Sequence, residues 1–223
     1  MKLGILFSGG KDSCLALYRA MQKEEVVCLL TVISKNPESF MFHTPNIHLT
    51  EKQAEAIGLP LVSVVTEGEK EKELKELKEV MERGKEEFGI EGVVTGTIES
   101  VYQAARIQKI CDSLKLWCFN PLWQKNQEEI LKELVENGFE VLITGVFAEP
   151  FGREWLGKRI DKEVVKKLVE IEGINPAGEG GEIETTVLDA PFFRKRIKVK
   201  GREIKFENNS GIMEIKKVEL VEK

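Results

Sequence analysis

Apolar and polar positions follow two alternating patterns over the first 145 residues. Continuous apolar runs, typical of strands covered on both faces of a sheet, recur between segments with helical spacing. The runs lie at 3–7, 26–33, 61–65, 92–95, 116–119 and 139–144. Helices are predicted between them at about 12–23, 50–57, 69–88, 100–114 and 127–137. Strands that alternate with helices over short connections predict an α/β fold with a doubly wound parallel sheet.

The pattern changes after Thr144. Residues 145–155 mix aromatic, charged and glycine residues without either period, and a charged helix is predicted at about 160–172. The last residues alternate in polarity and turn at Gly201 and at 208–211, which predicts antiparallel strands. We therefore divide the chain into a domain at 1–145 and a smaller α+β lobe at 146–223. An edge of the C-terminal strands could pair between subunits, which allows a homo-oligomer.

Composition narrows the class of protein. The 223 residues are 42% hydrophobic and 32% charged, with a net charge of −5, which disfavours disorder and a dominant nucleic-acid-binding role. The sequence has no leader pattern and no apolar run long enough to span a membrane, so we expect a soluble cytoplasmic protein. Four cysteines without a Cys-x-x-Cys pair, and two histidines, predict reduced thiols rather than a metal centre.

The first apolar run ends in the most informative segment of the chain, Ser8-Gly9-Gly10-Lys11-Asp12-Ser13. Two adjacent glycines allow a sharp turn that brings backbone N–H groups close to an anion, and the helix that follows directs its positive end to the same point. Lys11 adds a cation, the serine hydroxyls can bind phosphate oxygens, and Asp12 could hold the Mg²⁺ of a nucleotide. The order differs from a Walker loop, because Asp12 follows Lys11. The alternative is an ordinary Gly-Gly turn.

The Ser8–Ser13 loop follows a strand and so lies at the carboxyl edge of the predicted sheet. Other unusual residues are expected at this edge, because ligands bind at the carboxyl ends of strands in such sheets. Gly96 follows the fourth strand, and the helix after it carries Tyr102, Gln103 and Arg106. His43 lies in the polar loop after the second strand; on its own, that loop favours a surface connection holding one satisfied histidine.

The second lobe contributes two candidate segments. Glu179, Glu182 and Glu184 lie among glycines, where they suit a cation, a metal or an amine, the alternative being a solvated turn. Arg153 lies beside Glu149, which is also consistent with a simple surface ion pair. Three aromatic residues of the same stretch favour packing over recognition. They are Phe147, Phe151 and Trp155.

The loop at Ser8–Ser13 resembles the PP-loop of N-type ATP pyrophosphatases, whose members cleave ATP between the α and β phosphates to adenylate a substrate. Together with other ordered matches, the chain resembles the diphthine–ammonia ligase family, in its short archaeal-type form. The matches are Ser8–Ser13, Met41–Asn46, Tyr102-Gln103 with Arg106, Pro121-Leu122-Trp123, Gly145–Trp155 and Gly173–Thr185.

The resemblance implies that ATP and Mg²⁺ are used to adenylate the carboxylate of diphthine on translation elongation factor 2, and that ammonium supplies the amide nitrogen. It implies catalytic roles for Lys11 and Asp12, with Gly96 flanking the nucleotide. Substrate-binding roles are implied for His43, Tyr102, Gln103, Arg106, Glu149, Arg153, Glu179, Glu182 and Glu184. A quaternary ammonium group such as that of diphthine suits aromatic faces and nearby anions. All four cysteines lie in predicted core elements, so none of them is an obvious glutaminase nucleophile. Free ammonium is therefore the expected nitrogen source.

Two alternatives remain open at this point. One is a related PP-loop enzyme that adenylates a different carboxylate or a tRNA base, although the acidic balance and the lack of Cys-x-x-Cys pairs count against tRNA thiolation. The other is a non-catalytic nucleotide-binding module, which would bind ATP without releasing pyrophosphate.

Overall fold

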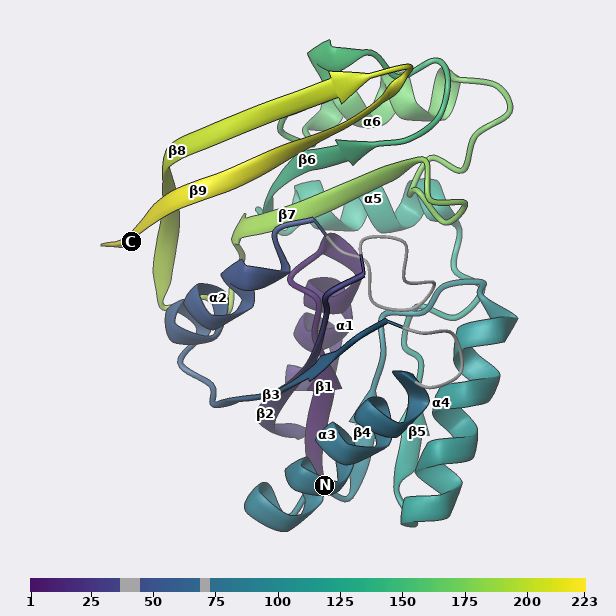
Figure 1. The fold of residues 1–223 in the computed structure, drawn as a ribbon, viewed down its shortest axis with the longest axis vertical. Helices are drawn as coiled ribbons and strands as arrows, with labels where there is room; N and C mark the ends of the chain where they lie inside the picture. The colour runs from purple at the N-terminus through teal and green to yellow at the C-terminus, as the bar shows by residue number, and fades with distance from the viewer. Residues whose placement is uncertain (37–44, 69–72) are drawn as a thin grey trace.

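A parallel sheet forms the centre of the N-terminal half of the computed structural model, which describes residues 1–36, 45–68 and 73–223 (Figure 1). Its five strands run in the order β3-β2-β1-β4-β5, and every pair is parallel. They are β1 (Lys2–Leu6), β2 (Glu25–Ser34), β3 (Leu61–Thr66), β4 (Gly92–Val94) and β5 (Trp117–Phe119). The predicted α/β fold is confirmed, and its central strands are the most apolar ones, as expected for a sheet covered on both faces.

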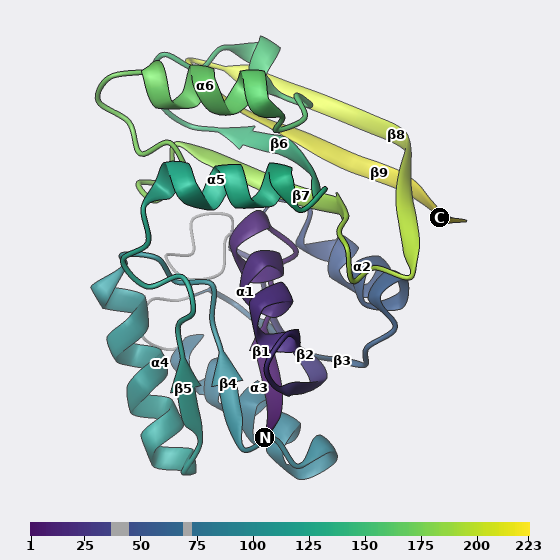
Figure 2. The same cartoon turned by 180° about the vertical axis from the view of Figure 1, so that it is seen from behind.

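Helices cover both faces of this sheet. The helices of this half are α1 (Lys11–Met21), α2 (Thr50–Ile57), α3 (Glu73–Phe88) and α4 (Val101–Leu114). Helices α3 and α4 share one buried cluster with β2, β3 and β4, whereas α1 packs in a second cluster with β1 (Figures 1 and 2). Residues 69–72, the expected start of α3, lie outside the described residues. The charged face of α3 is solvated, with i,i+4 ion pairs such as Arg83–Glu87.

A second, antiparallel sheet lies above the carboxyl edge of the first in the view of Figure 1. Its order is β7-β6-β9-β8, and the strands are β6 (Glu140–Val146), β7 (Ile183–Asp189), β8 (Lys195–Glu207) and β9 (Ser210–Glu222). Helices α5 (Gln127–Glu136) and α6 (Lys162–Glu170) lie together on one side of it (Figure 2). Short 3₁₀ helices occur at Ile47–Leu49 and Arg153–Trp155.

The prediction that 139–144 forms a sixth parallel strand is wrong. Strand β6 pairs antiparallel with β7 and β9 in the second sheet. From sequence alone, a strand that follows a helix fits a parallel βαβ unit as well as an antiparallel sheet. The partner that decides between them for β6 is β7, which lies about 40 residues later in the chain. The division of the chain at residue 146 stays a prediction.

The two sheets are joined by one continuous buried core. It runs from Leu3 and Ile5 of β1 through α1 and α5 to Ile143 of β6 and Ile215 of β9. No helix of the described residues is both long enough and apolar enough to cross a membrane. Strand β8 forms one edge of the second sheet, and pairing between subunits through it stays a prediction.

Candidate active site

The loop between β1 and α1 is a tight turn built by its glycines and serines. Gly9 has a φ of +77°, in the left-handed region that glycine adopts without a Cβ penalty. The Ser13 hydroxyl donates to the carbonyl of Gly10 (3.1 Å) and accepts hydrogen bonds from the backbone N–H (3.3 Å) and hydroxyl (3.2 Å) of Ser8. This internal bonding holds the loop open at the N-terminus of α1, as a phosphate site requires.

The loop is also held from outside by the second lobe. The backbone N–H of Lys11 donates to Thr185 Oγ1 of β7 (3.1 Å), and the N–H of Val187 donates to the carbonyl of Gly9 (3.0 Å). A Cβ on Gly10 would lie 3.3 Å from the carbonyl oxygen of Thr185. Strand β7 is therefore both an edge of the antiparallel sheet and a direct support of the loop.

Gln53 of α2 completes this support and was not predicted. Its amide nitrogen donates to the carbonyls of Gly9 (2.9 Å) and Val187 (2.8 Å), and the residue is 1% exposed. One side chain thus connects α2, the loop and β7. The sequence held one indication of this role. Gln53 lies on the inward face of the short helix between Thr50 and Ile57, where an apolar residue is expected.

We expect Gln53→Leu to lower the free energy of unfolding by about 1–3 kcal/mol, because it removes two buried hydrogen bonds, to the carbonyls of Gly9 and Val187. The measurement is urea unfolding followed by circular dichroism. The control is Lys52→Gln, a change at an exposed neighbour that should stay within about 0.5 kcal/mol of the wild type. Equal stability of the two variants would contradict the supporting role of Gln53.

Lys11 and Asp12 form an ion pair at the start of α1. The Lys11 ammonium lies 2.8 and 3.0 Å from the two carboxylate oxygens of Asp12, and the lysine side chain is only 4% exposed. Within the described ranges, no three His, Cys, Asp or Glu side chains are grouped as a metal centre. Asp12 nevertheless fits the Mg²⁺ of a nucleotide, because that ion takes most of its ligands from phosphates and water and needs only one or two carboxylates.

Gly96 is packed against the start of α1. A Cβ at this position would lie 2.7 Å from the carbonyl carbon of Asp12 and from the backbone nitrogen of Ser13. Nearby, Thr95 Oγ1 accepts from the N–H of Thr97 (3.0 Å), so the exit of β4 is held in a defined turn. The glycine therefore brings two backbones together at the carboxyl edge, which is compatible with its predicted place beside a nucleotide.

The three glutamates of the second lobe lie in different environments. Glu182 accepts hydrogen bonds from Asn175 and Gly180; burial alone would raise its pKa, but these hydrogen bonds outweigh that effect and lower it. Its carboxylate is occupied in closing its own loop. Glu179 instead accepts from the N–H of Glu99 (3.1 Å) after β4, and burial together with Asp12 raises its pKa.

Glu184 lies one residue before Thr185 and is half-buried. Burial raises the pKa of its carboxyl to about 7; Lys11 acts in the opposite direction and Asp12 in the same direction. A Cβ on Gly145, which faces it across β6 and β7, would lie 2.9 Å from Glu184 Cβ and 2.7 Å from the ring of Phe147. Glu184, Glu179 and Asp12 thus surround Lys11 with negative charge.

The predicted residues of α4 lie on the first turns of that helix. Tyr102, Gln103 and Arg106 are half-buried, and the guanidinium of Arg106 stacks on the Tyr102 ring at 3.4 Å from its centroid. The Ser100 hydroxyl caps the helix by accepting from the N–H of Gln103 (3.3 Å). Helix α4 follows the loop after β4, whose Glu99 N–H bonds Glu179. These side chains therefore lie at the same carboxyl edge of the parallel sheet as the phosphate loop.

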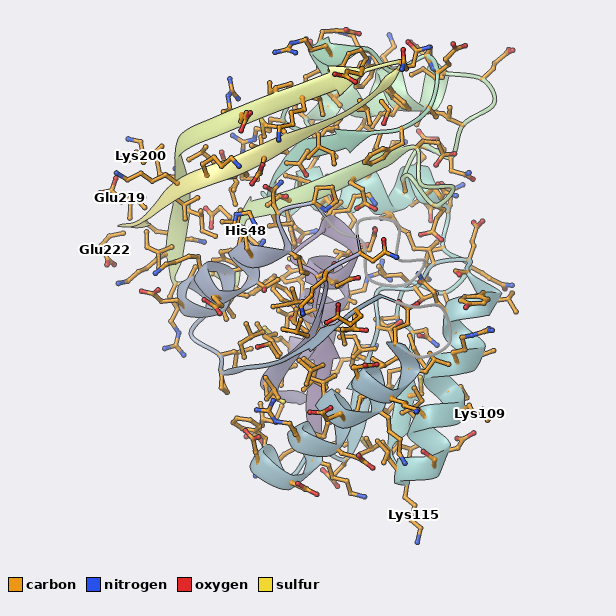
Figure 3. The ribbon with its side chains drawn as sticks, viewed as in Figure 1. His48, Lys109, Lys115, Lys200, Glu219 and Glu222 are labelled. Carbon is orange, nitrogen blue, oxygen red and sulfur yellow. The ribbon has the colours of Figure 1, made fainter. Side chains whose placement is uncertain are left out.

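Other candidate residues lie away from this cluster or outside the described residues. His43 falls outside them. The second histidine, His48, bonds the carbonyl of Ile215 in β9 (2.9 Å) and thereby docks the segment before α2 on the second sheet (Figure 3). Glu149 is exposed and accepts from the side chain of Asn209 (2.7 Å), and Arg153 is exposed without an ion pair to any described residue. The alternative of a surface ion pair between Arg153 and Glu149 is therefore wrong, and the substrate-binding role of the two residues stays a prediction.

Two of the three aromatic residues of 147–155 are core residues. Phe151 and Trp155 are 1% and 8% exposed and pack edge to face at 5.1 Å. The packing alternative therefore holds for both. Phe147 is half-buried beside Gly145 and Glu184 and remains as the aromatic candidate for a cation.

The buried cysteines provide no reactive thiol, whereas a hydrogen bond with Cys111 lowers the pKa of the half-buried Cys118. Cys14, Cys28 and Cys111 are buried, Cys118 is half-buried, and all four are free. Burial raises the pKa of Cys14, and it raises that of Cys28 to about 12. A glutaminase nucleophile needs an accessible thiolate, and these two buried thiols do not offer one.

A parallel sheet with a Ser-Gly-Gly-Lys-Asp-Ser turn at its carboxyl edge defines an α/β nucleotide-binding protein of the ATP pyrophosphatase type. The sequence model of the diphthamide synthase N-terminal domain matches residues 1–117, and that of the diphthamide synthase C-terminal domain matches residues 126–221. The chain belongs to the diphthamide synthase family.

Curated relatives agree with this assignment. The diphthine–ammonia ligases of mouse and human are 34% and 33% identical to the chain, over 91% and 92% of it and 84% and 85% of their own lengths. The fission yeast diphthine–ammonia ligase is 33% identical over 95% of the chain, which spans 38% of that longer protein. Among solved structures, a predicted subunit of tRNA methyltransferase from Methanocaldococcus jannaschii matches 86% of this chain and 98% of its own, with 17% identity and a TM-score of 0.42, too distant to bear on function.

Proposed function

We propose that the protein amidates the carboxylate of diphthine on translation elongation factor 2, using ATP and ammonium and releasing AMP and pyrophosphate in the cytoplasm. One observation carries the proposal: in a chain of this family, the phosphate loop is bonded directly to β7, the strand of the second lobe that carries Glu184 and directly follows the segment with Glu179 and Glu182. A nucleotide on the loop and an acceptor on that lobe would therefore meet. The two alternatives, another adenylated acceptor and a non-catalytic module, gain no support from the relatives.

The adenylation step follows from the chemistry of the acceptor. A carboxylate is a poor acyl donor because its leaving group would be oxide, so an acyl-adenylate supplies a better one. Backbone N–H groups of the loop other than that of Lys11, which bonds Thr185, would hold the departing phosphates together with the N-terminus of α1. Lys11 would offset the developing negative charge from a buried position, and Asp12 would hold Mg²⁺, which supplies further positive charge at the phosphates.

The acceptor site is proposed between α4 and the second lobe. Arg106, oriented by its stacking on Tyr102, presents a guanidinium that can bind a carboxylate in two places. Phe147 offers an aromatic face to the quaternary ammonium of diphthine, and Glu179 offers an anion. We leave Glu182 out of this site because its oxygens are occupied by its own loop.

The test follows radiolabelled ATP with purified protein, Mg²⁺ and ammonium, with and without elongation factor 2 that carries diphthine. We expect AMP and pyrophosphate only with the modified factor, and no AMP from Asp12→Ala. AMP formed equally without the factor would refute the acceptor, and ADP as the product would refute the PP-loop chemistry.

A further inference from the structure

The carboxylates around Lys11 do not all have a partner. Asp12 pairs with the Lys11 ammonium, and Glu179 accepts from the N–H of Glu99. The Glu184 carboxylate makes no hydrogen bond or ion pair with any residue of the described ranges, and the side chain is half-buried with its oxygens still open to solvent. A partly buried carboxylate with no protein partner is available to a ligand or a proton.

The position of Glu184 is set by the strand that supports the phosphate loop. It directly precedes Thr185, whose hydroxyl accepts from the backbone N–H of Lys11. Facing it across the sheet is Gly145, against which Glu184 Cβ and the Phe147 ring pack so closely that a Cβ would lie 2.9 and 2.7 Å from them. Among the described residues, the charged groups that act on it are Lys11 and Asp12 of α1, and β6 opposite contributes no charge at Gly145. The carboxylate is thus carried by the strand that bonds the phosphate loop, and it interacts electrostatically with the two charged residues of that loop.

We propose that Glu184 is the catalytic base that takes a proton from ammonium and delivers ammonia to the acyl-adenylate. The inference rests on the proposed function. Ammonium has no lone pair and cannot attack. After its proton moves to the Glu184 carboxylate, the ammonia lone pair forms a C–N bond with the acyl carbon, the C–O bond to AMP breaks, and AMP leaves with the electron pair. The surplus proton of the new amide nitrogen goes to solvent.

The protonation behaviour of Glu184 suits this role. A base works best when its pKa lies near the working pH, and burial raises that of Glu184 to about 7. An anion is also an attractive site for the ammonium cation before the proton moves. The rate of amidation should therefore rise with pH through about 7, because the carboxylate must be unprotonated to accept the proton.

The experiment compares wild type with Glu184→Gln, using ammonium or hydroxylamine as the nitrogen source at pH 7. Hydroxylamine is largely neutral there and needs no base to expose its lone pair. We expect the variant to lose about 10²-fold or more of its amidation rate with ammonium. Pyrophosphate exchange with the modified factor should be retained, and hydroxamate formation should stay close to wild type. The exposed Glu172→Gln serves as the control with unchanged rates.

Three outcomes would overturn the inference. They are undiminished amidation by Glu184→Gln with ammonium, an equal loss with ammonium and hydroxylamine, and a raised KM for the modified factor with kcat unchanged. Retained pyrophosphate exchange shows that the variant is folded. Absence of exchange in the wild type with the modified factor would instead overturn the proposed function itself, so the two failures are distinguishable.

Discussion

Replacing Lys11 with methionine is expected to lower AMP formation by about 10²–10³-fold, the usual effect of removing one charge stabiliser from a transition state. The Lys11 side chain is 4% exposed, so ions from solvent cannot take its place beside the phosphates. Methionine has a similar length and no charge, and it suits the buried site. Asp12 loses its partner but is 29% exposed and can be hydrated, so the fold should persist.

The measurement is the rate of AMP formation from radiolabelled ATP with the modified factor, together with the unfolding midpoint of each protein. Lys23→Met, an exposed change just beyond α1, is the matched control and should keep full activity. A Lys11→Met protein that forms AMP at the wild-type rate would remove Lys11 from the catalytic machinery.

Gly96→Ala is expected to weaken ATP binding and to lower the free energy of unfolding by about 1–3 kcal/mol, as overpacking does. The added methyl group would lie 2.7 Å from two backbone atoms of Asp12 and Ser13, and neither can rotate away as a side chain could. The clash can be relieved only if the segment that follows β4 moves away from α1. That movement would change the shape of the phosphate loop.

ATP affinity can be measured by isothermal titration calorimetry, and stability by urea unfolding. Gly201→Ala is the control, since a Cβ there would lie at an ordinary 3.5 Å from Lys217 Cβ. Equal affinity and stability of the two variants would show that the contact between Gly96 and α1 is not needed.

Features encoded by short-range patterns were predictable from the sequence. The apolar run before Ser8, the paired glycines and the helical spacing after Asp12 all act within a few residues, and together they gave the loop and the parallel sheet. Helix α2 was predicted at its observed bounds, Thr50–Ile57, because a glycine follows it in the left-handed conformation.

Features that depend on distant partners were not predictable. The hydrogen bond between Lys11 and Thr185 joins residues 174 positions apart, and no periodic pattern in the chain indicates that they are in contact. Strand β6 was assigned to the wrong sheet for the same reason, because its antiparallel partner comes later in the chain. The role of Gln53 was missed because its partners are backbone carbonyls of distant segments. Glu182 and Glu184 look alike in sequence, and only the hydrogen bonds within the loop distinguish the carboxylate that closes the loop, Glu182, from the one that we propose as a base, Glu184.

The attachment of β7 to the phosphate loop has a consequence for how two large substrates can meet. The bonds from Thr185, Val187 and Gln53 tie the loop to the lobe that would receive the protein acceptor. That lobe cannot swing away without distorting the turn that we propose to bind ATP. Activation and transfer would therefore occur at one preassembled site. The short-lived mixed anhydride would meet its amine there without leaving the protein, and hydrolysis would have little time to compete.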